Sequence, residues 1–430
     1  MIVLERRWRE IMFFDREYEN LKKFAEDLFD HPELGFKEER TQGKVIDYIH
    51  SVNPKAEIET FALTGLRVDL NHNRKHTMAF LAELDAVYTP NHFQANPQTG
   101  AAHTCGHFSQ VTIALALYHY FFVTQAYQQL DFNLAFIFVP AEEYLDLDYR
   151  RSLREQGKVV HLGGKAEAMR LGVFDDINFA IHIHSIGERF HEPTIELACD
   201  LAGFCYKYFD FQGRASHAGF DPYSGVNAYS MSTLFNTAIG LARQQMREDV
   251  YLRLNPIIMD ASSMSTNVIP DQVRVGTDIR SMSLDYMREV SQRLDQMAQG
   301  SALALGGQVT CETEMGYLPF HQDDYLTQLA KEAFMAYPAI TGLIDQRGAI
   351  AAAGDIGDLS YMLPCIQISY GGFEGRIHGI DFRMIDPEFV LKTFPDYLVQ
   401  CIHHISDSMD YNKLYRRSYS DYLSTLTTML

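Results

Sequence analysis

Three short runs of consecutive apolar residues in the first half of the chain predict buried strands. The runs are Thr77–Leu84, Phe132–Val139 and Ile177–Ile183, and each is bounded by charged or polar residues. Between the first two, Phe108–Gln125 carries apolar residues at helical spacing. Continuous apolar strands separated by helices are typical of a mostly parallel sheet with helices on both faces. The pattern therefore predicts an α/β fold.

The pattern changes after residue 195. Glu196–Gln212 alternates between apolar and polar residues, as a half-exposed antiparallel strand does. Further elements are then expected in this order: a loop over 221–225, a helix over Val226–Gln245, strands over Ser262–Asn267 and Gln272–Arg280, and a helix over Tyr286–Ala304. This order and its antiparallel character indicate a small, separate α+β domain.

The α/β style resumes afterwards, with a helix over Tyr325–Tyr337, a strand near Cys365–Ser369 and a last helix. A chain of 430 residues is long for one hydrophobic core, so two domains are expected. We predict one α/β domain formed by residues 1–197 and 309–430, interrupted by an inserted lid-like α+β domain over residues 198–308.

Composition and charge exclude several classes of function. Lys and Arg number 37 and Asp and Glu 56, which leaves a net charge of −19, so nucleic acid is not an expected partner. The six cysteines are spread along the chain and fit a reducing compartment. Charges interrupt the first residues, which argues against a signal peptide, and no run reaches the roughly 18 apolar residues of a membrane span. We expect a cytoplasmic protein with no membrane partner.

Polar residues follow the predicted strands where an α/β sheet presents its ligands, at the carboxyl ends. Asp85 follows the first strand, where its carboxylate can bind a metal ion or hold a ligating histidine; the alternative is a residue that forms a loop or caps a helix. Glu142 and Glu143 follow the second strand; one adjacent carboxylate can hold a metal ion while the other activates water. The alternative is an exposed acidic turn. His182 lies in the third strand, with His184 two residues on, as a ligand or a core residue.

The segment His103–His107 (HTCGH) precedes the first helix and is a candidate metal site. Cys105 and His107 are two residues apart, so in an extended segment their side chains project to the same side. Thiolate and imidazole both suit zinc and related ions. Taken alone, the motif favours a buried cysteine beside a polar loop histidine. Two further histidines, His217 in the inserted domain and His378 after a glycine-rich loop, are candidates for an oxyanion-stabilising lid residue and a last ligand.

Together these segments resemble the aminoacylase/hippurate-hydrolase branch of the M20 metallopeptidase family, and most nearly its amidohydrolases of aminobenzoyl-glutamate or N-acyl amino acids. The matching segments occur in the family's order through nearly the whole chain. They are His31–Phe36, Ala82–Ala86, His103–His107, Pro140–Glu143, Ser216–Gly219, Gly225–Ala228, Asn267–Pro270, Asp278–Arg280, Asp355–Ser360 and His378.

The resemblance implies a metal-activated water that cleaves the amide bond of a small molecule. It implies ligands for two divalent ions (zinc, manganese or cobalt), namely Cys105, His107, Glu143, His182 and His378. It also implies Glu142 as general base, His217 as the lid residue that polarises the scissile carbonyl, Asn267 and Arg280 as substrate contacts, and Asp85 as a support of the ligands. A homodimer through the lid domain is a further implication.

Phe108 departs from the family pattern, because Asp or Asn usually follows the ligating histidine. A missing polar neighbour lowers metal affinity by about 10–100-fold. The segment between Tyr88 and Ala101 also departs, and the tail beyond Tyr411 has no counterpart. Two alternatives therefore stand beside the amidohydrolase: an inactive or metal-poor relative that binds small molecules, and a dipeptidase.

Overall fold

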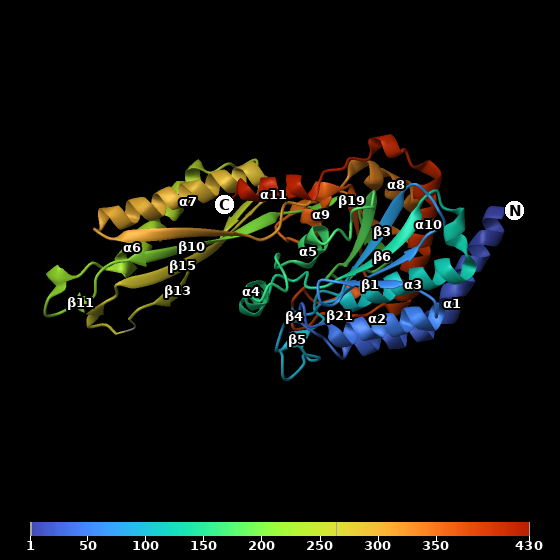
Figure 1. Cartoon of the computed structure of the whole chain (residues 1–430), viewed down its shortest axis with the longest axis horizontal. Helices are drawn as coiled ribbons and strands as arrows, with labels where there is room; N and C mark the ends of the chain where they lie inside the picture. The colour runs from blue at the N-terminus through green and yellow to red at the C-terminus, as the bar shows by residue number, and fades with distance from the viewer. Residues whose placement is uncertain (1, 264, 430) are drawn as a thin grey trace. The chain divides into compact units, whose positions relative to one another are not determined.

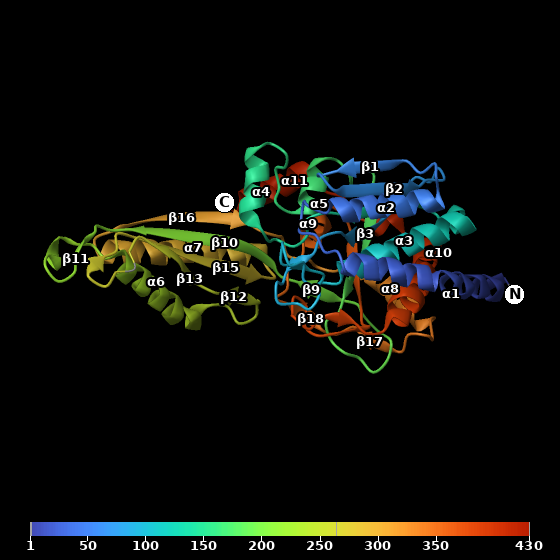
Figure 2. The same cartoon turned by 90° about the horizontal axis from the view of Figure 1, so that it is seen from below.

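The computed structural model describes residues 2–263 and 265–429 and divides into two compact units (Figures 1 and 2). The first unit contains the residues up to Cys199, together with His321–Gly348 and Asp358–Tyr419. The second contains Asp200–Phe320, Ala349–Gly357 and the residues from Ser420 onward. Each unit has its own hydrophobic core.

The first unit is built on an eight-stranded sheet. Its strands, in spatial order, are β1 (Ile58–Phe61), β2 (Gly65–Leu70), β6 (Asn133–Val139), β3 (Thr77–Glu83), β7 (Phe179–Ser185), β19 (Cys365–Tyr370), β8 (Thr194–Glu196) and β17 (Gly342–Ile344). The central strands β6, β3, β7 and β19 run parallel, whereas β1, β2 and β8 introduce antiparallel pairs. The expected α/β fold with a mostly parallel sheet is confirmed.

Helices cover this sheet. They are α1 (Ile2–Phe29), α2 (Glu39–Val52), α3 (His107–Thr124), α4 (Leu147–Glu155), α5 (Gly164–Arg170), α8 (Asp324–Met335), α9 (Ile356–Met362) and α10 (Phe394–Ser408). Figure 1 shows α1, α2 and α3 side by side beneath the strands. Because α3 lies between the sheet and the other two helices, its residues are apolar on nearly every side. This buried helix fixes the segment that precedes it, which contains Cys105.

The second unit is an antiparallel sheet with two long helices packed on it. Its strands are β10 (Gly203–Gln212), β12 (Leu252–Leu254), β13 (Ile257–Ala261), β15 (Gln272–Ser281) and β16 (Gln308–Met315), and its helices are α6 (Ala228–Ala242) and α7 (Leu284–Ala304). Its core contains Phe209, Phe211, Phe235 and Leu294. The separate antiparallel insert that the sequence predicts is confirmed.

Two details of this unit differ from expectation. The strand expected over Ser262–Asn267 includes residue 264, which lies outside the described residues, and β13 ends just before that stretch. β16, where the sequence pattern predicts no strand, pairs with β10 from Cys205 to Gln212 and so completes the antiparallel sheet. Long-range pairing of this kind leaves no local signal in the sequence.

The remaining elements are short. They are β4 (Val87–Tyr88), β5 (Ala101–Ala102), β9 (Cys199–Leu201), β11 (Ser216–His217), β14 (Val268–Ile269), β18 (Gly348–Ile350), β20 (Phe373–Glu374), β21 (Arg383–Met384), α11 (Tyr419–Thr427) and the single turns η1 (Ala126–Gln129), η2 (Pro222–Ser224), η3 (Arg243–Gln245), η4 (Phe389–Thr393) and η5 (Tyr411–Lys413). None of the helices in the described part of the chain has the length and apolar composition needed to cross a membrane.

The tail beyond Tyr411 is a packed part of the structure. Tyr411 stacks on the His76 ring with 3.7 Å between centroids, and Arg416 donates hydrogen bonds to the carbonyls of Ile177 and Phe174. These contacts fasten the tail to the first unit. Further along, the Met429 side chain is buried in the core of the second unit.

Candidate metal centre

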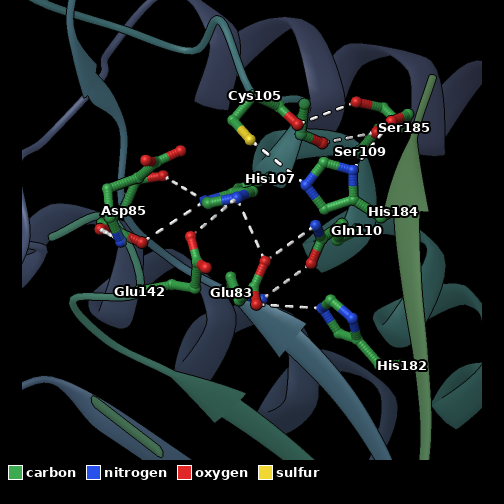
Figure 3. A network of polar contacts seen from close by, with 12 residues as sticks. Glu83, Asp85, Cys105, His107, Ser109, Gln110, Glu142, His182, His184 and Ser185 are labelled. Atoms are coloured by element: carbon green, nitrogen blue, oxygen red, sulfur yellow. Dashed lines mark hydrogen bonds and ion pairs between the residues drawn. The ribbon is translucent and has the colours of Figure 1, made fainter. Parts of the chain in front are cut away.

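The carboxyl ends of β3, β6 and β7 bring the acidic and histidine side chains together in the first unit, as Figure 3 shows. Glu83 ends β3, with Asp85 two residues on, and Glu142 and Glu143 follow β6. His182 and His184 lie on β7 and face the same side because strand side chains alternate. The site thus lies where an α/β sheet offers its ligand positions.

The turn before α3 is shaped by Gly106. Its φ of +82° lies in the left-handed region, and a Cβ there would meet the Ser185 Oγ at 2.5 Å. The Ser185 hydroxyl instead donates a hydrogen bond to the carbonyl of Cys105 at 2.9 Å. Glycine thus lets the turn pack closely against β7. This close packing brings Cys105 and His107 into the site.

Asp85 supports two of the candidate ligands. His107 Nδ1 lies 2.8 Å from the Asp85 carbonyl, to which it donates, and the Asp85 carboxylate accepts the Glu143 backbone N–H at 2.9 Å. Burial alone lowers the pKa of His107, but the charges of Glu83 and Asp85 raise it to about 9. The hydrogen bond on Nδ1 leaves Nε2 as the atom directed into the site.

The loop that carries Glu142 and Glu143 is held by buried side chains of opposite charge. Ala141 has a φ of +54°, a strained conformation for a residue other than glycine. Its N–H donates to Glu38 Oε1 at 2.8 Å, and its carbonyl accepts from Arg150 at 3.0 Å. This clamp places the Glu142 carboxylate 3.9 Å from His107 Nε2.

The buried carboxyl group of Glu38, which holds this loop, predicts a pH-dependent contribution to stability. Burial, and then the charge of Asp85, raise the pKa of Glu38 from 4.5 to about 7. Between these values the folded state keeps the proton that the unfolded state has lost, so stability falls as pH rises through this range. A shift of this size corresponds to about 3 kcal/mol. Relative to wild type, a Glu38→Gln variant should escape this loss, since its amide can still accept from Ala141 and donate to Thr64.

Urea unfolding at several pH values from 4.5 to 8 measures the effect. The matched control is Glu39→Gln, at an exposed neighbouring position, which should follow the wild-type pH dependence. Parallel stability curves for wild type and Glu38→Gln would contradict the prediction.

His378 reaches the same site from the loop after β20. Its backbone N–H donates to the Thr104 carbonyl at 2.8 Å, and its φ is +62°. The strained backbone and this anchor beside Cys105 place its Nε2 2.9 Å from Glu143 Oε1. Burial raises the pKa of Glu143, but the contact with His378 outweighs it and lowers the value to about 2.

The two histidines of β7 have different partners. His184 Nε2 lies 3.3 Å from the Cys105 sulfur, whereas His182 Nε2 lies 3.0 Å from Glu83 Oε1. The sequence noted both histidines of this strand but gave the role of ligand to His182 alone, and it gave Glu83 no role. Glu83 carries the same signal as Asp85, a carboxylate at the end of an apolar strand. Because side chains alternate along a strand, His182 and His184 face the same side, and the sequence pattern does not indicate which of them binds metal.

Among the described residues, three groups of donors lie close enough together to hold a metal ion. They are Cys105 with His107 and His184, Cys105 with Glu143 and His378, and Glu83 with His107 and Glu142. Four of the five ligands expected from the resemblance occur in these groups, namely Cys105, His107, Glu143 and His378. His182, two residues before His184 on β7, occurs in none of the three and remains a predicted ligand.

The donor set fits divalent ions. Buried nitrogens His107 Nε2 and His182 Nε2 and the buried oxygen Asp85 Oδ1 have no hydrogen-bond partner within the described residues. Burial and the carboxylates of Glu143 and Glu142 raise the pKa of Cys105 well above its ordinary value. A bound cation offsets that cost and stabilises the thiolate. Nitrogen, oxygen and sulfur donors in one buried cluster suit zinc and related transition metals.

The remaining candidates lie in the second unit. His217 Nδ1 accepts the backbone N–H groups of Gly219 and Phe220 at 3.1 and 2.9 Å, and Asn267 is nearby because its carbonyl accepts the Ala218 N–H. Arg280 is separate from them. It lies near the far end of β15 and is bound to Asp278 at 2.7 Å. The structure thus brings together His217 and Asn267 but not Arg280.

Phe108 points into the protein core. Its side chain is only 2% exposed, and its ring packs on Phe29 and Phe373 with centroid distances of 5.0 and 6.4 Å. The position after His107 therefore contributes to packing here and supplies no hydrogen bond to the ligands.

Comparison with known proteins identifies a family for the chain. Residues 79–397 match the family described as "Peptidase family M20/M25/M40". An N-acetyldiaminopimelate deacetylase of Bacillus velezensis is 24% identical over 396 residues, covering 86% of this chain and 94% of the relative. One from Shouchella clausii is 26% identical over 316 residues, covering 71% and 76%.

Solved structures share the fold. A dinuclear metal-binding peptidase of the M20 family from Bacillus subtilis has a TM-score of 0.71 at 18% identity, covering 92% of this chain and all of its own. An aminobenzoyl-glutamate utilization protein from Klebsiella pneumoniae has a TM-score of 0.66 at 18% identity, covering 91% and 97%. Since the family match spans well over half of the sequence, the chain belongs to peptidase family M20/M25/M40 and is a hydrolase that acts on amide bonds.

Proposed function

We propose that this protein is a metal-dependent amidohydrolase that cleaves the amide bond of a small N-acyl amino acid or related conjugate. The observation that carries the proposal is the position of Glu142, a buried carboxylate 3.9 Å from His107 Nε2 at the edge of a cluster of metal-binding side chains. The similarity to N-acetyldiaminopimelate deacetylases supports an acetylated amino acid as the substrate.

The cofactor is a pair of divalent ions, for which zinc, manganese and cobalt are the candidates. Cys105, His107, Glu143 and His378 hold the pair, together with a histidine of β7. When bound, a divalent ion of this kind lowers the pKa of a coordinated water from about 15.7 to roughly 7. A solved structure of the same fold is described as a dinuclear metal-binding peptidase, which supports two ions here.

The side chains then have distinct tasks. Glu142 takes a proton from the attacking water, whose oxygen forms a bond to the acyl carbon. His217 Nδ1 accepts two backbone N–H groups, so in the neutral ring Nε2 carries the hydrogen and can donate it to the developing oxyanion. Glu142 returns the proton to the leaving nitrogen as the C–N bond breaks. The products are a carboxylate and a free amine.

A substrate panel tests the proposal. Protein purified without chelators and supplied with zinc, manganese or cobalt is assayed for amine release from N-acetyl amino acids, N-acetyldiaminopimelate, aminobenzoyl-glutamate and dipeptides. We expect the N-acyl amino acids to be cleaved with the highest kcat/KM. Preference for dipeptides would make the protein a dipeptidase, and no hydrolysis of any member would contradict the proposal.

Phe108 favours one other function, a metal-poor protein that binds small molecules without cleaving them. The packing of its ring removes a polar neighbour from His107. Elemental analysis separates the amidohydrolase from this metal-poor binding protein. Less than about one metal ion per chain, with no response to added metal, would favour the binder.

A homodimer through the second unit is part of the proposal. Along β13 the exposed fractions of Ile257, Ile258 and Met259 are 53, 46 and 52%, and within the described residues this strand pairs only with β15. Helix α6 of the same unit also exposes an apolar side chain, Leu241, at 73%. An exposed apolar strand edge is a template for pairing with a second chain.

A charge on this edge should separate the dimer. Ile258→Lys introduces a cation that pairing of two β13 edges would bury, so we expect a monomer by size-exclusion chromatography with light scattering. Leu303→Lys, at an 81% exposed position on α7, is the matched control and should remain dimeric. A dimer of unchanged stability in Ile258→Lys would place the contact elsewhere.

A further inference from the structure

Arg150 is a buried cation on helix α4, which follows the loop that carries Glu142. Its side chain is only 1% exposed, whereas the other two arginines of this helix, Arg151 and Arg154, lie at least partly at the surface. Burying a charge is costly unless the group is paired and hydrogen-bonded. The partners of the Arg150 side chain therefore indicate what its buried position contributes to the protein.

The guanidinium binds the backbone on both sides of Glu142. Nη1 donates to the carbonyl of Ala141 at 3.0 Å, and Nη2 donates to the carbonyl of Glu143. The N–H groups of the same two residues are also bound. That of Ala141 donates to Glu38 at 2.8 Å, and that of Glu143 donates to Asp85 at 2.9 Å. Both neighbours of Glu142 are thus held at their N–H and at their carbonyl, which fixes the backbone from which the Glu142 carboxylate projects.

Further contacts seat the guanidinium in this position. Nη1 also donates to the Leu162 carbonyl at 2.7 Å, and the Phe36 ring centroid lies 5.5 Å from Arg150 Cζ. Nη2 lies 3.9 Å from the Asp85 carboxylate, which provides an opposite charge. Gly35 leaves room for the group, because a Cβ at this residue would lie 2.3 Å from Nη2. These contacts fit the planar, forked shape of a guanidinium rather than a positive charge alone.

We propose that Arg150 is a positioning residue for amide hydrolysis and that it acts through Glu142. The carboxylate of a general base has to lie within hydrogen-bond reach of the proton that it takes. A misplacement of about 1 Å in such a group can lower a rate by about 10²-fold. Arg150 donates to backbone carbonyls and not to the reacting groups, so its effect on the rate is indirect. The inference rests on the proposed function, in which Glu142 is the general base.

A double-mutant cycle tests the proposal. Arg150→Met removes the charge and the donors but keeps a long side chain, and it is made both in the wild-type protein and in Glu142→Gln. Arg151→Met, the same change at the next position of α4, is the matched control. With metal supplied, kcat and KM are measured on the best substrate of the panel. Metal per chain and thermal unfolding are measured on the same preparations.

We expect Arg150→Met to lower kcat by about 10–10²-fold in the wild-type background, with KM and metal content nearly unchanged. In the Glu142→Gln background the same substitution should change kcat by less than about twofold, because a residue that acts through the base has no further effect once the base is gone. Arg151→Met should behave as wild type. Arg150→Lys keeps the charge beside Asp85 but not the forked donors, so its kcat should lie between those of wild type and Arg150→Met.

An equal fall of kcat in both backgrounds would overturn the proposal, since it would reflect a general disturbance of the fold. An unchanged kcat in Arg150→Met would overturn it as well. Loss of a metal ion from this variant would do the same, because Arg150 would then support the metal ligands instead of the base. If Arg150→Met does not fold, Arg150→Lys is carried through the same cycle and decides.

Failure of the inference and failure of the proposed function give different results. A wild-type protein that cleaves no member of the panel would overturn the proposed function, and the role of Arg150 with it. An active wild type in which the effects of Arg150→Met and Glu142→Gln multiply would overturn the role of Arg150 alone.

Discussion

Glu142→Gln lowers kcat for amide hydrolysis by about 10²–10⁴-fold, the usual contribution of a positioned general base. The amide has the shape of the carboxylate but cannot take a proton from water. Because Ala141 is held by Glu38 and Arg150, the loop should keep its conformation in the variant. KM should change little, since the interaction is made in the transition state.

Kinetics and elemental analysis on the same preparations check this result. Asp148→Asn, which removes a fully exposed carboxylate from α4, is the control and should behave as wild type. Activity of Glu142→Gln within a few-fold of wild type would contradict the role of general base. A loss of one metal ion in the variant would instead make Glu142 a ligand, as its closeness to Glu83 and His107 permits.

His217→Ala lowers kcat by about 10²–10³-fold, the effect of removing one oxyanion donor. The fixed Nε2–H tautomer described above is the reason to expect a donor here. Metal content should be unchanged, because His217 belongs to none of the donor groups found within the described residues.

Steady-state kinetics over a range of substrate concentrations measures this effect. Tyr223→Ala, at a 97% exposed position in the same loop, tests whether loop disturbance alone explains a loss, and it should leave kcat nearly unchanged. A rise in KM without a fall in kcat for His217→Ala would assign His217 to substrate binding rather than to the transition state.

The fold was largely predictable because apolar runs of strand length specify buried parallel strands. Each of the three predicted runs matches an observed strand, and helix α3 begins within one residue of expectation. The strand ends then pointed to Asp85, Glu142 and Glu143. This inference needs only local pattern and the rule that parallel strands present their carboxyl ends at one edge.

What could not be predicted depends on contacts between distant segments. Lys165 is a buried cation from α5, and nothing near it in the sequence indicates that it neutralises Glu83 on β3. Whether His182 or His184 is the metal ligand depends on how far along β7 each side chain lies from the other donors. The tail from Tyr411 has no periodic pattern, yet it is held by ring stacking on His76.

Phe108 shows how a departure from a family pattern acquires a physical meaning. The sequence indicated only that a polar residue was missing. The structure packs its ring against Phe29 and Phe373, so a polar substitution there would bury a polar group in the core and disturb the packing. Support of His107 comes instead from the Asp85 carbonyl.

The central claim is that the buried donor cluster holds metal and that this metal is required for amide hydrolysis. The most direct measurement is the rate of amine release from an N-acetyl amino acid as metal is removed by a chelator and returned stepwise, with metal per chain measured at each step. We expect no hydrolysis in the metal-free protein and recovery of activity as metal approaches two ions per chain. Hydrolysis that persists without metal, or metal that binds without restoring activity on any member of the panel, would contradict the account.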